Sequence, residues 1–120
     1  MKKKLYLYIA LLFGFLGFAQ QISSSIDSTQ IKIGSQFNLT IKAKVNAKDK
    51  VVFPAGKFFG ALEILESYPI DTLKNDNQYE LIKKYGLTQF DSGRYVIPKL
   101  LVKINQKEFR TDSLSILVND

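Results

Sequence analysis

Carboxylates are the side chains of this sequence that could take part in acid–base chemistry, because it contains no His and no Cys. That composition excludes a Ser-His-Asp triad, a thiol nucleophile, a Cys/His zinc site and a disulfide. Glu63 and Glu66 are three residues apart, a spacing that places two side chains on opposite faces of a strand. Asp71 and Asp76 flank a turn. We therefore expect these carboxylates to form a solvated surface, and we expect neither enzyme activity nor a cofactor or metal site.

Asp91, Gly93 and Tyr95 form an Asp-x-Gly-x-Tyr pattern. Asp favours a turn, Gly adopts backbone conformations closed to bulkier residues, and in immunoglobulin-like sandwiches the Tyr packs on the core while its hydroxyl bonds upstream backbone. The pattern therefore predicts a structural tyrosine corner. Ile97 stands where antibody domains carry their second Cys, and the chain has no Trp, so the prediction is a disulfide-free relative. An ordinary β-turn before a strand is the alternative.

Two kinds of side chain are candidates for contact with a partner. Phe58 and Phe59 lie in a Gly-flanked loop, where they could form an exposed apolar anchor or cap the end of a sandwich core. The other candidates are basic residues on the polar faces of strands: Lys42, Lys44, Lys83 and Lys84.

The elements that must position these residues show a period of two. Apolar and polar residues alternate most clearly from 36 to 45, which indicates a strand with one face in the core. Lys74–Asn77 and Asn105–Lys107 are typical of turns, and Gly86 is a candidate bulge. A helix over Tyr79–Tyr85 is the competing interpretation. The expected strands are Gln30–Gly34, Gln36–Val45, Val51–Pro54, Ala61–Tyr68, Gln78–Phe90, Arg94–Ile104 and Glu108–Val118.

Seven or eight short strands at roughly ten-residue spacing predict an all-β fold. We expect an antiparallel immunoglobulin-like β-sandwich over residues 20–120, held by its core without a disulfide and preceded by a helical signal peptide.

The first nineteen residues have the three parts of a secretory signal peptide. Lysines fill positions 2–4, an apolar run of 14 residues extends from Leu5 to Phe18, and Ala19 is a small residue at the exit. A spanning helix needs about 20 residues, so an uncleaved anchor is the weaker alternative, and a buried helix is weaker still. We therefore expect a signal peptide over residues 1–19 and an exported domain in the periplasm or cell envelope.

The positive charge of the chain after the signal peptide is too small and too scattered to indicate nucleic-acid binding. Without the lysines at 2–4, the 17 basic residues fall to 14 against 11 acidic ones, a formal charge of +3. These charges are scattered, with no run of five like charges, so we expect no nucleic-acid partner.

In the order of these segments the chain resembles the BatD-like, or oxygen tolerance, family of Bacteroidetes. The resemblance covers nearly all of the chain after the signal peptide, and its most specific part is a Gly-x-Tyr-x-Ile-Pro step that leads into a hairpin. It is carried by Gly34–Leu39, Val52–Pro54, Phe59–Ile64, Gly93–Pro98, Val102–Phe109 and Thr111–Leu114.

The resemblance implies an exported, membrane-associated protein built from immunoglobulin-like domains. Such proteins are encoded beside von Willebrand A-domain Bat proteins and a MoxR-type ATPase, and they are linked to aerotolerance or envelope stress. The resemblance brings no catalytic residues. Family members are longer and usually carry a C-terminal membrane helix. Membrane association of this chain would thus need a segment after Asp120 or an uncleaved signal.

We therefore expect a non-enzymatic envelope domain that binds protein partners, with Bat A-domain proteins as the partners that the resemblance implies. The alternative is a carbohydrate- or surface-binding adhesive module of similar fold. That alternative needs exposed aromatic platforms, for which the candidates are Tyr68, Tyr79 and Tyr85.

Overall fold

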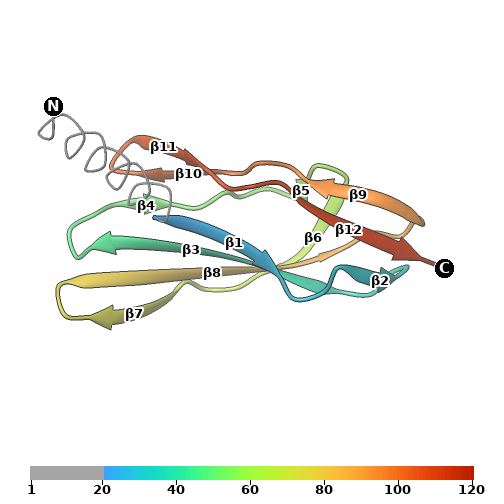
Figure 1. Cartoon of the computed structure of the whole chain (residues 1–120), viewed down its shortest axis with the longest axis horizontal. Helices are drawn as coiled ribbons and strands as arrows, with labels where there is room; N and C mark the ends of the chain where they lie inside the picture. The colour runs from blue at the N-terminus through green and yellow to red at the C-terminus, as the bar shows by residue number, and fades with distance from the viewer. Residues whose placement is uncertain (1–20) are drawn as a thin grey trace, which may run out of the picture.

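Strands make up the regular structure of residues 21–120, the part of the chain that the computed structural model describes (Figure 1). The signal peptide expected over residues 1–19 lies outside these residues. The all-β prediction is confirmed for the described part, but the expected number of strands is too low. There are twelve: β1 (Ile22–Ile26), β2 (Gln30–Lys32), β3 (Phe37–Asn46), β4 (Val51–Val52), β5 (Phe58–Phe59), β6 (Leu62–Ser67), β7 (Asp71–Asn75), β8 (Gln78–Thr88), β9 (Gly93–Ile97), β10 (Leu101–Ile104), β11 (Lys107–Arg110) and β12 (Leu114–Asn119).

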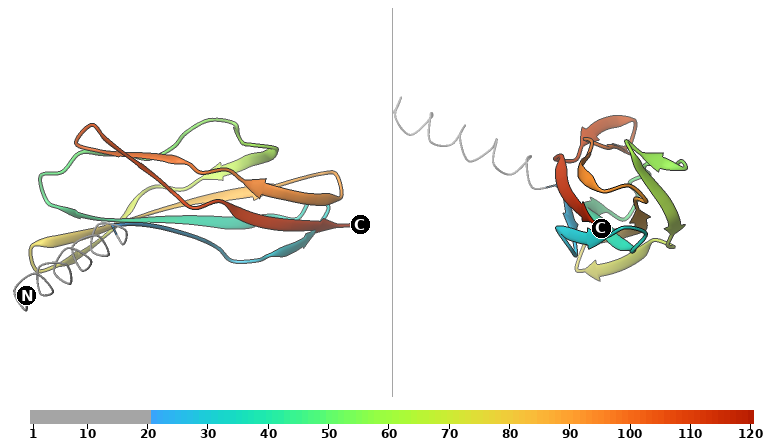
Figure 2. Two further views of the ribbon diagram at one scale, coloured as in Figure 1. Left: turned by 45° about the horizontal axis from the view of Figure 1, so that its top comes forward. Right: turned by 90° about the vertical axis from the view of Figure 1, so that its right-hand side faces the viewer.

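The strands form two layers with the core between them (Figures 1 and 2). One layer is a six-stranded sheet of order β1-β3-β8-β6-β5, in which β7 also pairs with β8. The other layer contains two three-stranded sheets, β11-β10-β4 and β2-β12-β9. Paired strands are antiparallel, except that β2 runs parallel to β12. The described part is elongated, with extents of 61 × 34 × 23 Å.

The ladder between β3 and β8 is the longest in the molecule. It pairs ten residues in unbroken register, from Phe37 opposite Leu87 to Asn46 opposite Gln78. Alternate residues of β3 are buried, as the period of two predicts. The alternative helix over Tyr79–Tyr85 is wrong, because these residues pair with β3 on one side and with β6 or β7 on the other.

Each of the last two expected strands is divided into two. Pro98 has no N–H to donate to a ladder, and the chain leaves β9 at Ile97 and enters β10 at Leu101. The return segment breaks at the same level, between β11 and β12. Thr111 is buried there, and its hydroxyl accepts a hydrogen bond of 2.8 Å from the Leu100 N–H. The second layer is therefore two short sheets in series, with the two breaks bonded to each other.

The expected bulge at Gly86 is wrong. Gly86 stays in register opposite Asn38, and the shift lies in β6, between Ile64 and Glu66. A Cβ on Gly86 would lie 2.3 Å from Nε2 of Gln36, so the glycine instead leaves room for that side chain to cross the strand.

Two hairpin turns match the turn residues in the sequence. Asp76 has a φ of 55° between β7 and β8, and Asn105 and Gln106 have φ values of 51° and 72° between β10 and β11. Positive φ at both central residues, as at Asn105 and Gln106, is the type I′ geometry, which follows the natural twist of a hairpin; in the β7–β8 turn Asp76 alone has positive φ.

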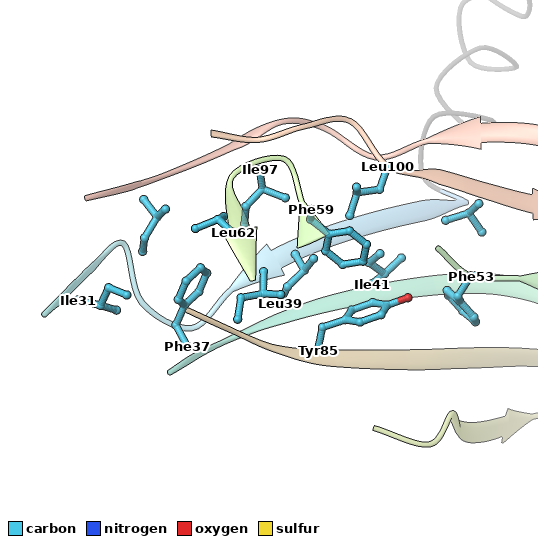
Figure 3. Close-up of a cluster of buried hydrophobic side chains, with 14 of the residues drawn as sticks. Ile31, Phe37, Leu39, Ile41, Phe53, Phe59, Leu62, Tyr85, Ile97 and Leu100 are labelled. Carbon is cyan, nitrogen blue, oxygen red and sulfur yellow. The ribbon is translucent and has the colours of Figure 1, made fainter. Parts of the chain in front are cut away.

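Tyr85, on the central strand β8, and Phe59, on the edge strand β5, pack against each other inside the core (Figure 3). Tyr85 is 1% exposed, its ring meets that of Phe59 edge-on at 4.9 Å, and its hydroxyl donates to the carbonyl of Pro54. The same core contains further apolar side chains that are almost fully buried: Phe37, Leu39, Ile41, Leu62, Leu87, Ile97, Val102, Ile116 and Val118.

Burial raises the pKa of Tyr85 above its ordinary value. A group whose pKa is raised by folding stabilises the folded state below its unfolded pKa, which for Tyr is about 10, and that contribution is lost as the pH rises further. We expect Tyr85→Phe to lower the unfolding free energy by about 1 kcal/mol at neutral pH, because the bond to Pro54 is lost. In urea titrations this deficit should shrink above about pH 10. A deficit that is the same at neutral and alkaline pH would contradict the assignment.

Candidate functional site

Phe58 and Phe59 are adjacent on β5 and point to opposite faces. Phe59 is 4% exposed and packs on Tyr85, whereas Phe58 is 59% exposed. The two interpretations of this pair therefore apply to one residue each. Phe59 is part of the core, and Phe58 is the side chain available to a partner.

The β5–β6 hairpin is held in place from several sides, so the position of Phe58 is well defined. Gly60 has a φ of 61°, and a Cβ there would lie 3.1 Å from Cδ of Pro98, so glycine both makes the turn and lets the hairpin approach β9. Nε2 of Gln89 donates to the carbonyl of Ala61 over 2.7 Å. These contacts fix the hairpin against the second layer.

A further apolar side chain is exposed on β6, two residues after Glu63, the register partner of Phe58. Leu65, at the bulge of β6, is 45% exposed. We call Phe58 and Leu65 together the β5–β6 edge. An exposed aromatic residue next to an aliphatic one on a rigid hairpin is typical of a protein-binding anchor.

The four lysines proposed as contacts do not lie on one face. Lys42 and Lys44 are exposed on the outer face of β3, and Nζ of Lys42 lies 3.9 Å from Oε1 of Glu80. Lys84 is exposed on the same face of β8, opposite Thr40. These three lysines share the outer face of the large sheet with the acidic residues Glu80 and Asp71.

Lys83 belongs to the opposite face. It is half-buried, its Nζ donates to the carbonyl of Tyr68, and it lies 5.3 Å from the centre of the Tyr85 ring. Its ammonium group thus fills the point where β6 ends and β7 begins. The expectation that Lys83 shares a polar face with Lys84 is wrong, because successive side chains of a strand alternate.

The structure does not bring Phe58 and the lysines of β3 into one site. In the large sheet β8 and β6 lie between β3 and β5. Three strand spacings, roughly 14 Å, separate the two positions across the sheet. They are also offset along it, because Phe58 is level with Thr88 of β8 and Lys42 is level with Ile82. They are therefore two separate candidate surfaces.

The three tyrosines offered for an adhesive module provide no fully exposed aromatic platform. Tyr85 is buried, and Tyr68 and Tyr79 are half-buried. The Tyr68 hydroxyl lies 3.2 Å from Nε2 of Gln36, and a hydrogen bond with Glu66 raises the pKa of Tyr68.

Asp91, Gly93 and Tyr95 lie together at the start of β9. The Tyr95 hydroxyl donates to the carbonyl of Asp91 over 3.1 Å, and Gly93 has a φ of 144°. The Tyr95 ring packs partly against the core. The three residues thus form a structural unit at the turn into β9.

Sequence reasoning missed a shallow polar hollow at one end of the molecule, although both of its segments carry turn residues. The loop after β3 and the turn between β7 and β8 line it. Asp49 ties that loop together, because it accepts hydrogen bonds of 2.8 Å from the Asn46 N–H and 2.7 Å from Nδ2 of Asn105. These bonds, the first above all, lower the pKa of Asp49.

Among residues 21–120, no three His, Cys, Asp or Glu residues cluster in a way that could hold a metal ion. The same stretch contains no helix long and apolar enough to cross a membrane.

A carboxyl group whose pKa is lowered by folding stabilises the protein above its unfolded pKa, about 3.9 for Asp, and that contribution is lost as the pH falls through the folded value. We expect Asp49→Asn to lower the unfolding free energy at neutral pH, and the difference from wild type to shrink below about pH 4. Urea unfolding at both pH values measures it. A difference independent of pH would contradict the role given to the carboxylate.

Comparison with known proteins identifies the family of this chain. A family model described as the BatD DUF11-like domain matches residues 24–118, which include all of β2 to β11 and parts of β1 and β12. No curated protein and no solved structure matches the chain. Since the family match takes in nearly all of the described residues, the chain belongs to the BatD family through a DUF11-like domain.

Proposed function

We propose that this BatD-like domain is an exported, non-catalytic module of the cell envelope that binds a protein partner at the β5–β6 edge. The observation that carries the proposal is the 59% exposure of Phe58 on a hairpin whose next residue, Phe59, is anchored in the core. An aromatic side chain held in this way loses little conformational freedom when it is buried by a partner.

The strand order supports an immunoglobulin-like assignment, which makes such a role reasonable. The neighbours β1-β3-β8-β7 correspond to the A-B-E-D sheet of that fold, and β4-β10-β11 correspond to its C-F-G sheet. In this assignment β9 and β10 are two parts of the F strand, divided at Pro98, and Tyr95 on β9 lies near its start, the position of the tyrosine corner. Sandwiches of this kind commonly bind partners through loops and strand edges.

The chemistry of the sequence supports a non-catalytic role. The full chain has no His and no Cys, so its hydroxyl groups have no imidazole to activate them and it has no thiol nucleophile. The first nineteen residues, with their basic start, apolar run and small exit residue, support export.

The proposed partner is a von Willebrand A-domain Bat protein, the class that family resemblance implies, and the proposed context is envelope stress or aerotolerance.

Phe58→Ser tests the proposal. We expect it to weaken binding of a purified A-domain Bat protein by roughly 10- to 100-fold in calorimetry, as for a central aromatic contact. The unfolding free energy should change by no more than about 0.5 kcal/mol, because the side chain is exposed. Leu73→Ser is the matched control, since Leu73 is 56% exposed on β7 at another edge of the same sheet.

Phe59→Ala tests the core side of the same hairpin and should affect stability, whereas Phe58→Ser should affect binding. It should cost about 3–5 kcal/mol of stability, because it leaves a cavity against Tyr85. The proposal fails if wild-type protein does not bind the A-domain protein, or if the Phe58 and Leu73 variants bind equally well.

A further inference from the structure

Strand β1 has a palindromic sequence at an open edge of the large sheet. It reads Ile22-Ser23-Ser24-Ser25-Ile26, the same in both directions. Within residues 21–120 it pairs with β3 alone (Figure 1). One long side of β1 is therefore without a strand partner in the described part of the chain.

The hydrogen bonds to β3 determine which backbone groups face that side. The N–H of Lys44 donates to the carbonyl of Gln21 over 2.9 Å, and the N–H of Asp27 donates to the carbonyl of Asn38 over 3.1 Å. In an antiparallel ladder such bonded pairs alternate, so Ser23 and Ser25 also bond to β3. The N–H and C=O groups of Ile22, Ser24 and Ile26 then point to the open edge.

This edge lacks the features that keep other edges of the described fold from pairing. β2, β7, β9 and β11 each carry at least one charged side chain, and β4 and β5 contain two residues each. Charged residues and short strands are the usual protection of a sheet edge. β1 has five uncharged residues and no proline.

Ser24, at the centre of the palindrome, has an unmet hydrogen-bonding group. Its Oγ is buried on the inner side of the sheet, in register with Ile41, and has no hydrogen-bond partner within the described residues. A buried hydroxyl without a partner is unfavourable. Rotation about χ1 of Ser24 would carry the hydroxyl from its covered position toward the open edge, where a neighbouring strand could supply the partner.

We propose that a second copy of this chain pairs with β1 along this edge, antiparallel and about a two-fold axis at Ser24. A palindromic strand is complementary to itself under such an axis, as a closed dimer requires. Ile22 then lies opposite Ile26 of the partner subunit, Ser23 opposite Ser25 of the partner subunit, and Ser24 opposite the partner's Ser24.

This register satisfies each group that the open edge leaves free. The outward N–H and C=O groups of Ile22, Ser24 and Ile26 bond to their counterparts, and the two Ser24 hydroxyls bond to each other on the inner side. The isoleucines meet next to the core, and the outer face presents only serines. The large sheets of the two copies become one continuous sheet.

The surface is independent of the partner site proposed above. β5 and β1 are at opposite ends of the strand order, so the dimer leaves Phe58 accessible. Failure of one proposal leaves the other standing, and each has its own measurement.

Paired cysteine variants test the register. The chain has no Cys, so Ser23→Cys and Ser25→Cys each introduce a single thiol. In the proposed dimer these positions form a non-bonded pair with Cα atoms about 4.5 Å apart, within the range of a disulfide. Both variants are expressed as the full 120-residue chain with different affinity tags and purified as the cell delivers them.

We expect the mixture of the two variants to form disulfide-linked heterodimers about tenfold faster than either variant alone, because pairing raises the local thiol concentration. Ser113→Cys, exposed in the loop after β11, gives the background rate when mixed with Ser23→Cys. A mixture that cross-links no faster than this background or than the separate variants overturns the proposal.

Ser24→Pro tests the same edge without a thiol. Its missing N–H is one that points away from β3, so the ladder inside the molecule keeps its bonds. Sedimentation equilibrium should show a monomer–dimer equilibrium for wild type, and a dimer dissociation constant raised about tenfold in the variant. A wild-type mass that stays monomeric over the whole concentration range, or a folded variant that dimerises like wild type, overturns the proposal. If the variant does not fold, the cysteine pair decides.

Discussion

The ladder between β3 and β8 is the constraint on which the rest of the molecule depends. β1 attaches to its outer strand, and β6 and β7 attach one after the other to β8, so each further strand of the large sheet takes its register from these ten pairs. A one-residue shift in the register between β3 and β8 would expose the buried side chains of β3 to solvent and would turn its lysines toward the core. The positions of Phe59, Lys42 and Lys44 therefore follow from one register.

The second layer shows how a chain without disulfides covers so long a sheet. Two long paired strands would have to keep a matching twist over the whole length of the large sheet. Pro98 instead divides the first of them into β9 and β10, and the returning segment is divided into β11 and β12. The break is sealed where Leu100 and Thr111 exchange two hydrogen bonds, one through the buried hydroxyl and one between backbones. Ile97, 1% exposed, is held in the core beside this break by packing alone.

The local pattern of the sequence predicted the all-β class, the strand from residue 36 to 45 and the positions of the two hairpin turns, because each depends on neighbouring residues alone. It did not predict the divided strands, because a proline such as Pro98 is compatible both with an irregularity inside one strand and with a point where the chain passes from one sheet to another. The bulge in β6 was missed for a related reason. Gly86 faces a side chain from another segment, Gln36, and that contact is absent from a local pattern. The same distinction between local pattern and tertiary structure applies to the candidate site. Alternation along a strand explains why Phe58 and Phe59 point to opposite faces. The distance between Lys42 and Phe58 depends on the order of the strands in the sheet, which the local pattern does not contain.

The two ends of the large sheet present different kinds of surface. At β5 the edge is only two residues long, which leaves little backbone to pair, so the proposed recognition there rests on a side chain, Phe58. At β1 the edge is five residues long and uncharged, so recognition there must come from the backbone. Backbone pairing is poorly selective by itself, and the palindrome about Ser24 supplies the selectivity by favouring an identical strand. A domain with these two edges can join a copy of itself on one side and a different protein on the other, without competition between the two contacts.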